Sequence, residues 1–344
     1  MRSRGVAILG GLFALSVGAS VRAAEPFAKV GSYAGTVFNL PRGVRSIGMG
    51  STGTADVSRS ATGYFNPASF AWADAVTATV SNEAWPADLD LVDTRVSGAF
   101  PLQPDSSDGP WRFGGSLGYT ELSMDPQVIR TIYLPEGTGE TFDEDDYFIT
   151  GSAAAAWTRG GWSFGAGVNA KYANLAPGGV STWAFDLGFI AAFPIRWEHA
   201  LIQPRIGVAS LNLGPGVTYE DREGQLDHQT RSGWGLDVVS PSLIVGGRAV
   251  PAVSFSAEFD ATRSTRADAV DAYGVEVSVI NAVQVRFGEI IYNEEQRQTT
   301  YGVGMGWDWG SWLVQFDYAR TNQSLFGPYN WDRDAFGAAL GVRW

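Results

Sequence analysis

The chain has 344 residues, no cysteine and a formal net charge of −12, with 13 Trp, 12 Tyr, 19 Phe and 43 Gly. The absence of cysteine excludes disulfides and thiolate chemistry, and the acidic balance argues against nucleic acid as a partner. Many glycines together with many aromatic residues are unusual for a soluble α/β enzyme and typical of close-packed strands with aromatic girdles.

Residues 1–23 are typical of a secretory signal peptide. Arg2 and Arg4 give a charged start, residues 6–17 are apolar, and Val21-Arg22-Ala23 is a plausible cleavage site. Cleavage would remove three arginines and take the net charge from −12 to −15. The apolar stretch is short for a spanning helix, so an uncleaved anchor is the less favoured interpretation.

Residues 24–72 are predicted to be a lead-in followed by a plug, because the stretch GVRSIGMGSTGTADVSRSATGYFNPASFAW at 43–72 is rich in Gly, Ser and Thr. This stretch resembles the N-terminal signature of FadL-like outer-membrane barrels, which include long-chain fatty acid transporters and the PorV/PorQ proteins of type IX secretion. Val57 and Ser69 depart from the family pattern. The resemblance implies a fourteen-stranded barrel whose lumen holds this segment, with a plug motif of Gly43, Gly48, Gly50, Asp56, Asn66 and Pro67.

Residues 73–344 are predicted to form an all-β, antiparallel transmembrane barrel. After residue 23 no apolar run approaches the roughly 20 residues of a membrane helix, whereas the pattern from Asp74 onward has period two. Fourteen stretches read as strands: 75–84, 91–101, 111–122, 146–158, 161–174, 182–194, 199–211, 235–249, 253–262, 272–280, 283–292, 299–308, 311–321 and 333–344.

The alternation gives each strand one apolar face and one polar or very small face. A soluble sandwich would alternate in the same way, so hairpin registers are needed to separate the two environments. A turn at Arg159-Gly160 would pair Trp157 with Trp162, and a turn at Trp309-Gly310 would pair Trp307 with Trp312. Tryptophans beside tight turns suit a membrane interface.

Loop lengths and the chain end agree with an outer-membrane barrel. The longest connections, 123–145 and 212–234, fall where external loops are expected, and the connections after strands four, eight, ten and twelve are tight, as periplasmic turns should be. The connection after strand two is longer than this rule predicts. The C-terminal stretch resembles the signal read by the barrel-assembly machinery, through Phe336, Leu340 and Trp344. Outer membrane lipids and that machinery are thus expected partners.

No catalytic or nucleotide site is recognisable, and the chain is predicted to be neither an enzyme nor a cofactor-binding protein. His199 and His228 are isolated, so a triad built on either is remote. Inward-facing charges form the stronger candidate site. A turn at Asn281 would place Glu276 opposite Arg286, either bracing the wall and plug or receiving a substrate carboxylate. The predicted lumen charges are Lys171, Asp186, Glu258, Asp260, Glu276, Arg286 and Asp317.

The predicted external loop 123–145 combines acidic with apolar residues. Its carboxylates could bind calcium, but their spacing matches no known loop motif, so no metal site is assigned and a solvated acidic face is favoured. Its apolar stretch 128–134 could receive a hydrophobic solute or a protein, or pack on itself.

Two functions are compatible with these features, and a structural barrel without a ligand is a third interpretation. The favoured hypothesis is passive uptake of a hydrophobic small molecule across the outer membrane, gated by the plug. The alternative is a PorV-like scaffold that holds secreted proteins at the cell surface without transport, which the compact size and the 274–288 pattern favour. A continuous apolar path from the loops through the wall would support the first, whereas a tightly occluded lumen with an exposed loop groove would support the second.

Overall fold

The computed structural model describes residues 34–58, 63–85, 89–99, 110–142, 145–175, 179–197, 200–219, 222–245, 248–292, 296–309, 311–324 and 330–343. The predicted signal peptide, most of the lead-in, most of the connection after strand two, His199 and Trp344 lie outside these residues.

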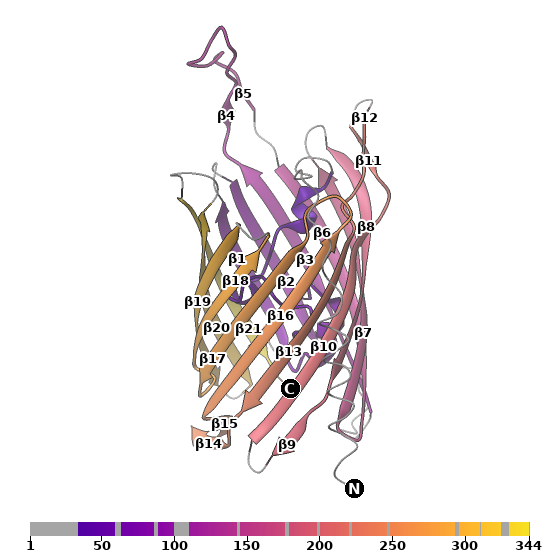
Figure 1. Cartoon of the computed structure of the whole chain (residues 1–344), viewed down its shortest axis with the longest axis vertical. Coiled ribbons are helices and arrows are strands. Elements are labelled where there is room, and N and C mark those ends of the chain that lie inside the picture. Colours follow the sequence, from indigo (N-terminus) through magenta and orange to yellow (C-terminus); the bar gives the residue numbers. More distant parts are fainter. Residues whose placement is uncertain are drawn as a thin grey trace.

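Fourteen antiparallel strands of the described residues close into one barrel (Figure 1). Strand β21 pairs with β1 from Val342 opposite Val76 to Asp334 opposite Ala84, which leaves the barrel without a free edge. The predicted all-β barrel is therefore confirmed. Its strands are β1 (Val76–Trp85), β2 (Leu89–Ala99), β3 (Trp111–Met124), β6 (Asp145–Arg159), β7 (Trp162–Leu175), β8 (Val180–Ala192), β10 (Ala200–Leu213), β13 (Gln229–Val239), β16 (Val253–Ser264), β17 (Val270–Val279), β18 (Val283–Ile291), β19 (Arg297–Trp309), β20 (Trp312–Ser324) and β21 (Asn330–Val342).

Short ribbons extend the barrel at both ends. At the upper end in Figure 1 are β4 (Gln127–Val128) with β5 (Thr141–Phe142), and β11 (Val217–Tyr219) with β12 (Arg222–Gly224). Both lie in the connections predicted to be the longest external ones. At the lower, periplasmic end are β9 (Ile195–Trp197), β14 (Ser242–Val245) and β15 (Arg248–Pro251).

The predicted eighth strand, 235–249, is wrong at both ends. Strand β13 begins at Gln229 and ends at Val239, and residues 240–252 contain the hairpin β14–β15 instead of a tight turn. Pro241 explains the break, because proline has no N–H for a ladder hydrogen bond. The apolar residues beyond it pair with each other, Leu243 with Val250 and Ile244 with Ala249.

Both predicted hairpin registers are shifted by two residues. Trp162 lies opposite Arg159 and Trp312 opposite Trp309. The β6–β7 turn is formed by Gly160 and Gly161, with φ of 61° and 87°. Two positive φ angles define the turn that matches strand twist, and two glycines adopt it without strain. The shift keeps apolar residues opposite apolar residues, as Trp157 opposite Phe164 shows.

The outer wall is apolar. Large side chains with exposed fractions of about 40–70% point outward along successive strands, including Leu117, Phe185, Val208, Phe287 and Phe316. Trp162, Trp309 and Trp312 lie near the periplasmic turns. Among the described residues no helix is long and apolar enough to cross a membrane. A closed barrel with an apolar wall and aromatic residues at its rim is a transmembrane β-barrel of the outer membrane.

The N-terminal part of the described chain lies against the inner wall (Figure 1, indigo). We call residues 34–58 and 63–73 the inner segment. It contains η1 (Thr36–Asn39), α2 (Val44–Gly48) and η2 (Pro67–Trp72). Helix α2 contacts β18–β21, whereas η2 contacts β2, β3, β6, β7 and β8. The inner segment therefore spans the lumen from one wall to the other.

Candidate functional site in the barrel lumen

The inner segment packs directly against the backbone of the wall. Asn66 caps η2, its side chain accepting from the Ala68 amide at 3.1 Å, and it also donates to the carbonyls of Thr54 and Phe189 at 2.8 and 3.0 Å. A Cβ on Gly188 would lie 1.9 Å from Asn66 Oδ1. Comparable clashes with the inner segment would follow at other inward glycines of the wall: Gly114, Gly167, Gly207, Gly274 and Gly288.

These contacts explain the very small residues on the inward face. Glycine occupies these positions because the backbone of the inner segment fills the space that a side chain would need. Of the predicted plug motif, Gly48 lies against Gly302, and Gly50 donates its amide to Thr300 Oγ1 at 2.9 Å. Gly43 precedes α2 with a φ of 83°. The role of this motif as a plug stays a prediction.

Arg45 joins the inner segment to the wall. Its Nη1 lies 2.8 Å from Asp56 Oδ2, within the inner segment, and its Nε lies 3.1 Å from Glu276 Oε2, on β17. Glu258 on β16 lies 3.8 Å away. All three carboxylates are partly or fully buried, so the guanidinium offsets negative charge that water cannot reach.

Arg286 forms ion pairs with two carboxylates of the wall. The structure places it opposite Glu276, with Nε 2.6 Å from Glu276 Oε2 and Nη1 2.5 Å from Asp317 Oδ1. Glu276 lies on the neighbouring strand β17, and Asp317 lies on β20, two strands away from β18. This geometry fits the bracing role better than the reception of a substrate carboxylate, because an incoming anion would have to displace two ion pairs.

A second ionic cluster holds residues 51–54. Asp260 Oδ2 accepts from the amides of Gly53 and Thr54 at 2.9 and 3.0 Å and lies 2.9 Å from Arg231 Nη2. Arg231 also donates to the Ser51 carbonyl at 2.9 Å, and its guanidinium lies 4.0 Å from the Phe65 ring centroid. The Asp260 carboxylate thus accepts backbone hydrogen bonds from the inner segment.

Lys171 on β7 and Asp186 on β8 are wall residues that lie near η1, at the N-terminal end of the inner segment. Lys171 Nζ lies 2.8 Å from Asp186 Oδ2 and 2.8 Å from Asn212 Oδ1. Asn212 in turn donates to Asn39 Oδ1 at 2.6 Å, and Asn39 donates to Asp227 at 2.9 Å. This chain of contacts links the wall, η1 and the external connection between β12 and β13.

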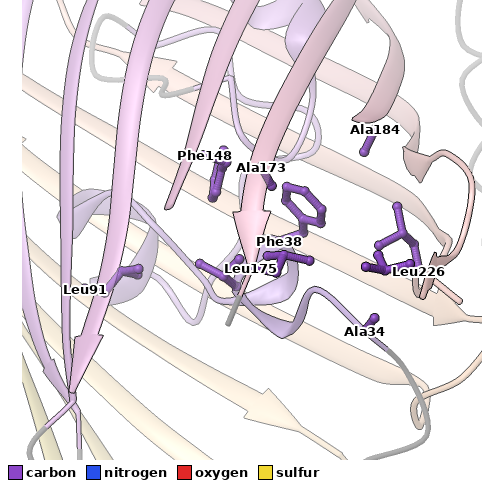
Figure 2. Packing of buried hydrophobic residues seen from close by; sticks show 10 residues of the cluster. Ala34, Phe38, Leu91, Phe148, Ala173, Leu175, Ala184 and Leu226 are labelled. Carbon is purple, nitrogen blue, oxygen red and sulfur yellow. The ribbon is translucent and has the colours of Figure 1, made fainter. Parts of the chain in front are cut away.

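An apolar cluster surrounds η1 (Figure 2). Phe38 packs edge-on against Phe148 with ring centroids 5.2 Å apart, and Lys171 Nζ lies 5.5 Å from the Phe38 ring centroid. We call this set the external apolar cluster: Ala34, Val37, Phe38, Leu91, Phe148, Ala173, Leu175, Ala184, Val217 and Leu226. Phe38, contributed by the inner segment, lies among wall and loop residues.

Below the external apolar cluster the lumen becomes polar. Arg42 lies 4.3 Å from the Phe148 ring centroid and 4.9 Å from that of Tyr64, and Arg95 lies 4.3 Å from the Tyr64 ring centroid. A cavity of about 360 Å³ follows on the periplasmic side of α2. Its charged lining consists of Arg45, Arg95, Arg286, Asp93, Asp237, Glu276, Asp308 and Asp317.

Several lumen residues were missed by sequence reasoning: Arg42, Arg45, Arg95, Arg205, Arg231 and Asp227. The parity of β10 and β13 could have indicated Arg205 and Arg231, because each alternates with outward residues. Arg205 lies 2.9 Å from Asp237 and 3.6 Å from Asp56. No local signal points to Arg45 or Asp227, because Glu276, which pairs with Arg45, and Asn39, which donates to Asp227, are far away in the sequence.

The remaining candidates lie outside the lumen. Phe336 and Leu340 face outward with exposed fractions of 58% and 50%, and their role as an assembly signal stays a prediction. His228 lies in an external connection, where its backbone amide donates to Thr265 Oγ1 at 3.2 Å. Within the described part of the chain, no three His, Asp or Glu side chains are grouped to hold a metal ion.

No protein-family model and no curated protein sequence matches the chain. Solved structures do. A deltaS2S3 mutant of the TodX monoaromatic hydrocarbon channel matches with a TM-score of 0.53 and 11% identity, over 88% of this chain and 99% of that one. The toluene transporter TbuX of Ralstonia pickettii matches with a TM-score of 0.50 and 13% identity, over 89% and 100%.

At this identity the likeness concerns the fold. It defines the class of the protein, an outer-membrane β-barrel of fourteen strands among the described residues. This class agrees with the barrel that the resemblance to FadL-like proteins implies. No comparison supports the PorV/PorQ branch of that superfamily.

Proposed function

We propose that this barrel is a passive channel for hydrophobic small molecules, which enter at the external apolar cluster. The observation that carries the proposal is the position of Phe38. A side chain of the inner segment fills an apolar site that lies directly beneath the external connections, since Val217 and Leu226 belong to those connections. Such a site suits a ligand that leaves water for an apolar environment.

The inner segment serves in this proposal as the plug. The lumen below the external apolar cluster is charged and is crossed by the inner segment, so the described structure offers no continuous apolar path. Transport therefore requires the inner segment to move away from the wall. Arg45 and Asp260 hold it in the closed position through contacts with β17 and β16.

The size of the site favours ligands with a single aromatic ring. The Phe38 ring already makes an edge-on contact with Phe148 and a cation–π contact with Lys171, both of which a free ring could make instead. The structurally similar barrels named above are a monoaromatic hydrocarbon channel and a toluene transporter. Toluene is accordingly the first probe.

A reversible lock of the inner segment tests the proposal. A Cβ on Gly337 would lie 3.6 Å from Val44 Cβ, within the range for a disulfide, and the chain has no cysteine to interfere. We expect cells that contain the Val44→Cys/Gly337→Cys variant to take up radiolabelled toluene slowly when oxidised and at the wild-type rate after reduction.

Single-cysteine variants under the same treatment provide the control, since they cannot form the bond. A second variant, Phe38→Ala, empties the site and should raise equilibrium binding of toluene to purified protein, whereas Phe185→Ala, on the outer wall, should not. Toluene uptake equal to that of a host without the barrel would refute the proposed function. Uptake unaffected by the lock would refute the plug.

A further inference from the structure

The outer wall carries a notch where the last strand meets the first. Ala338 faces outward on β21, with Phe316 of β20 and Val80 of β1 as its partners on either side. A methyl group between larger side chains leaves a cavity of about 490 Å³, which is also lined by Val303, Met305, Tyr318 and Phe336. That volume lies within the range of small-ligand sites.

An ionic cluster lies on the same face, toward the external end of β20 and β21. Arg320 forms an ion pair with Asp332 and lies 3.8 Å from Asp334. Tyr318, which lines the notch, donates to Asp334 at 2.7 Å. These charged side chains are about one third exposed. The notch and the cluster are therefore adjacent parts of one surface.

The charge of this cluster sets it apart from two other outward ion pairs. Among the described residues, Arg263 pairs with Asp271 and Arg297 pairs with Glu289, each as one cation to one anion. Arg320 faces two carboxylates. The cluster thus has one surplus negative charge in a region where salt and water only partly screen it.

We propose that the notch and this cluster bind one membrane lipid with a zwitterionic headgroup. An acyl chain fills the notch, because the outer wall of a transmembrane barrel is covered by lipid. The headgroup ammonium lies at Asp332 and Asp334, and its phosphate lies at Arg320. A headgroup with only negative charge lacks the ammonium and meets the surplus carboxylate. The site does not depend on the proposed transport function.

Native mass spectrometry of the purified protein with two lipids of identical acyl chains tests this site. We expect phosphatidylethanolamine to be retained about two- to fivefold more than phosphatidylglycerol, the effect of an exposed ion pair. Ala338→Phe should abolish the retained lipid, whereas the matched change Ala166→Phe, at another outward alanine, should not. The double variant D332N/D334N should lose the preference while keeping the notch.

Equal retention of the two lipids by the wild type would overturn the proposal. So would a preference for phosphatidylglycerol or lipopolysaccharide, or full retention by Ala338→Phe. Asp332 and Asp334 are about one third exposed, so their substitutions test headgroup recognition even where the larger substitution prevents folding.

Discussion

At the scale of single residues, Arg45 connects parts of the chain that are far apart in the sequence. It pairs with Asp56 eleven residues away and with Glu276, which is separated from it by 231 positions. Removing one partner of a buried ion pair leaves the other charge without compensation. Substitution of Arg45 therefore measures how strongly the inner segment is attached to the wall.

We expect Arg45→Met to lower the free energy of unfolding by about 3 kcal/mol, because Asp56 and Glu276 keep only their other arginines, Arg205 and Arg286. Denaturant titration in detergent micelles measures this change. The matched variant Arg263→Met breaks a pair that is more than one third exposed and should cost less than about 1 kcal/mol.

A double variant separates ionic coupling from lost packing. If Arg45 acts through Glu276, the Arg45→Met/Glu276→Gln protein should be more stable than the sum of the two single changes predicts. Strict additivity would show that the ion pair does not hold the inner segment.

At the scale of elements, the two external ribbons differ in their contacts. The β4–β5 ribbon stands above the barrel (Figure 1), and Ile132 and Tyr133 at its tip are more than 90% exposed. The β11–β12 ribbon lies against the external apolar cluster, in which Val217 is 2% exposed. One ribbon is thus free of the core, and the other is part of it.

Replacing residues 126–142 by a short Gly-Ser linker should change the free energy of unfolding by less than about 0.5 kcal/mol, because none of residues 126–141 is buried. The same replacement of residues 217–224 should destabilise by roughly 2–3 kcal/mol, since Val217 is lost from the cluster. Thermal unfolding followed by heat-dependent gel mobility compares the two. A large loss from the first deletion would contradict this view of the β4–β5 ribbon.

At the scale of the whole molecule, the apolar wall requires a membrane around it. Val275 lies at the middle of β17 and faces outward, and Val279 lies on the same face beside the periplasmic turn. An arginine costs most at the bilayer midplane and least near the interface. The two positions differ in depth but not in strand or face.

We expect Val275→Arg to destabilise the folded protein in lipid vesicles by about 2–4 kcal/mol, and Val279→Arg by about 0–1 kcal/mol. Reversible denaturant unfolding in vesicles gives both values. An equal cost at the two positions would mean that the cost of an arginine on this face does not depend on its depth in the membrane.

The sequence by itself determined the barrel and much of its wall. Period-two patterns placed fourteen strands, and the β17–β18 turn placed Glu276 opposite Arg286, because both depend on residues that are near each other along the chain. Strand β13 and two hairpin registers were wrong, since Pro241 and the Gly160-Gly161 turn impose local geometry that hydrophobic alternation does not reveal.

The tertiary structure alone decided what lies inside and outside this wall. Arg45 meets Glu276, Phe38 reaches Phe148, and Asn39 reaches Asp227 only because the barrel closes around the inner segment. The notch at Ala338 likewise requires β21 to lie beside β1. These contacts join distant segments, and no local pattern in the sequence specifies which inward residue meets which.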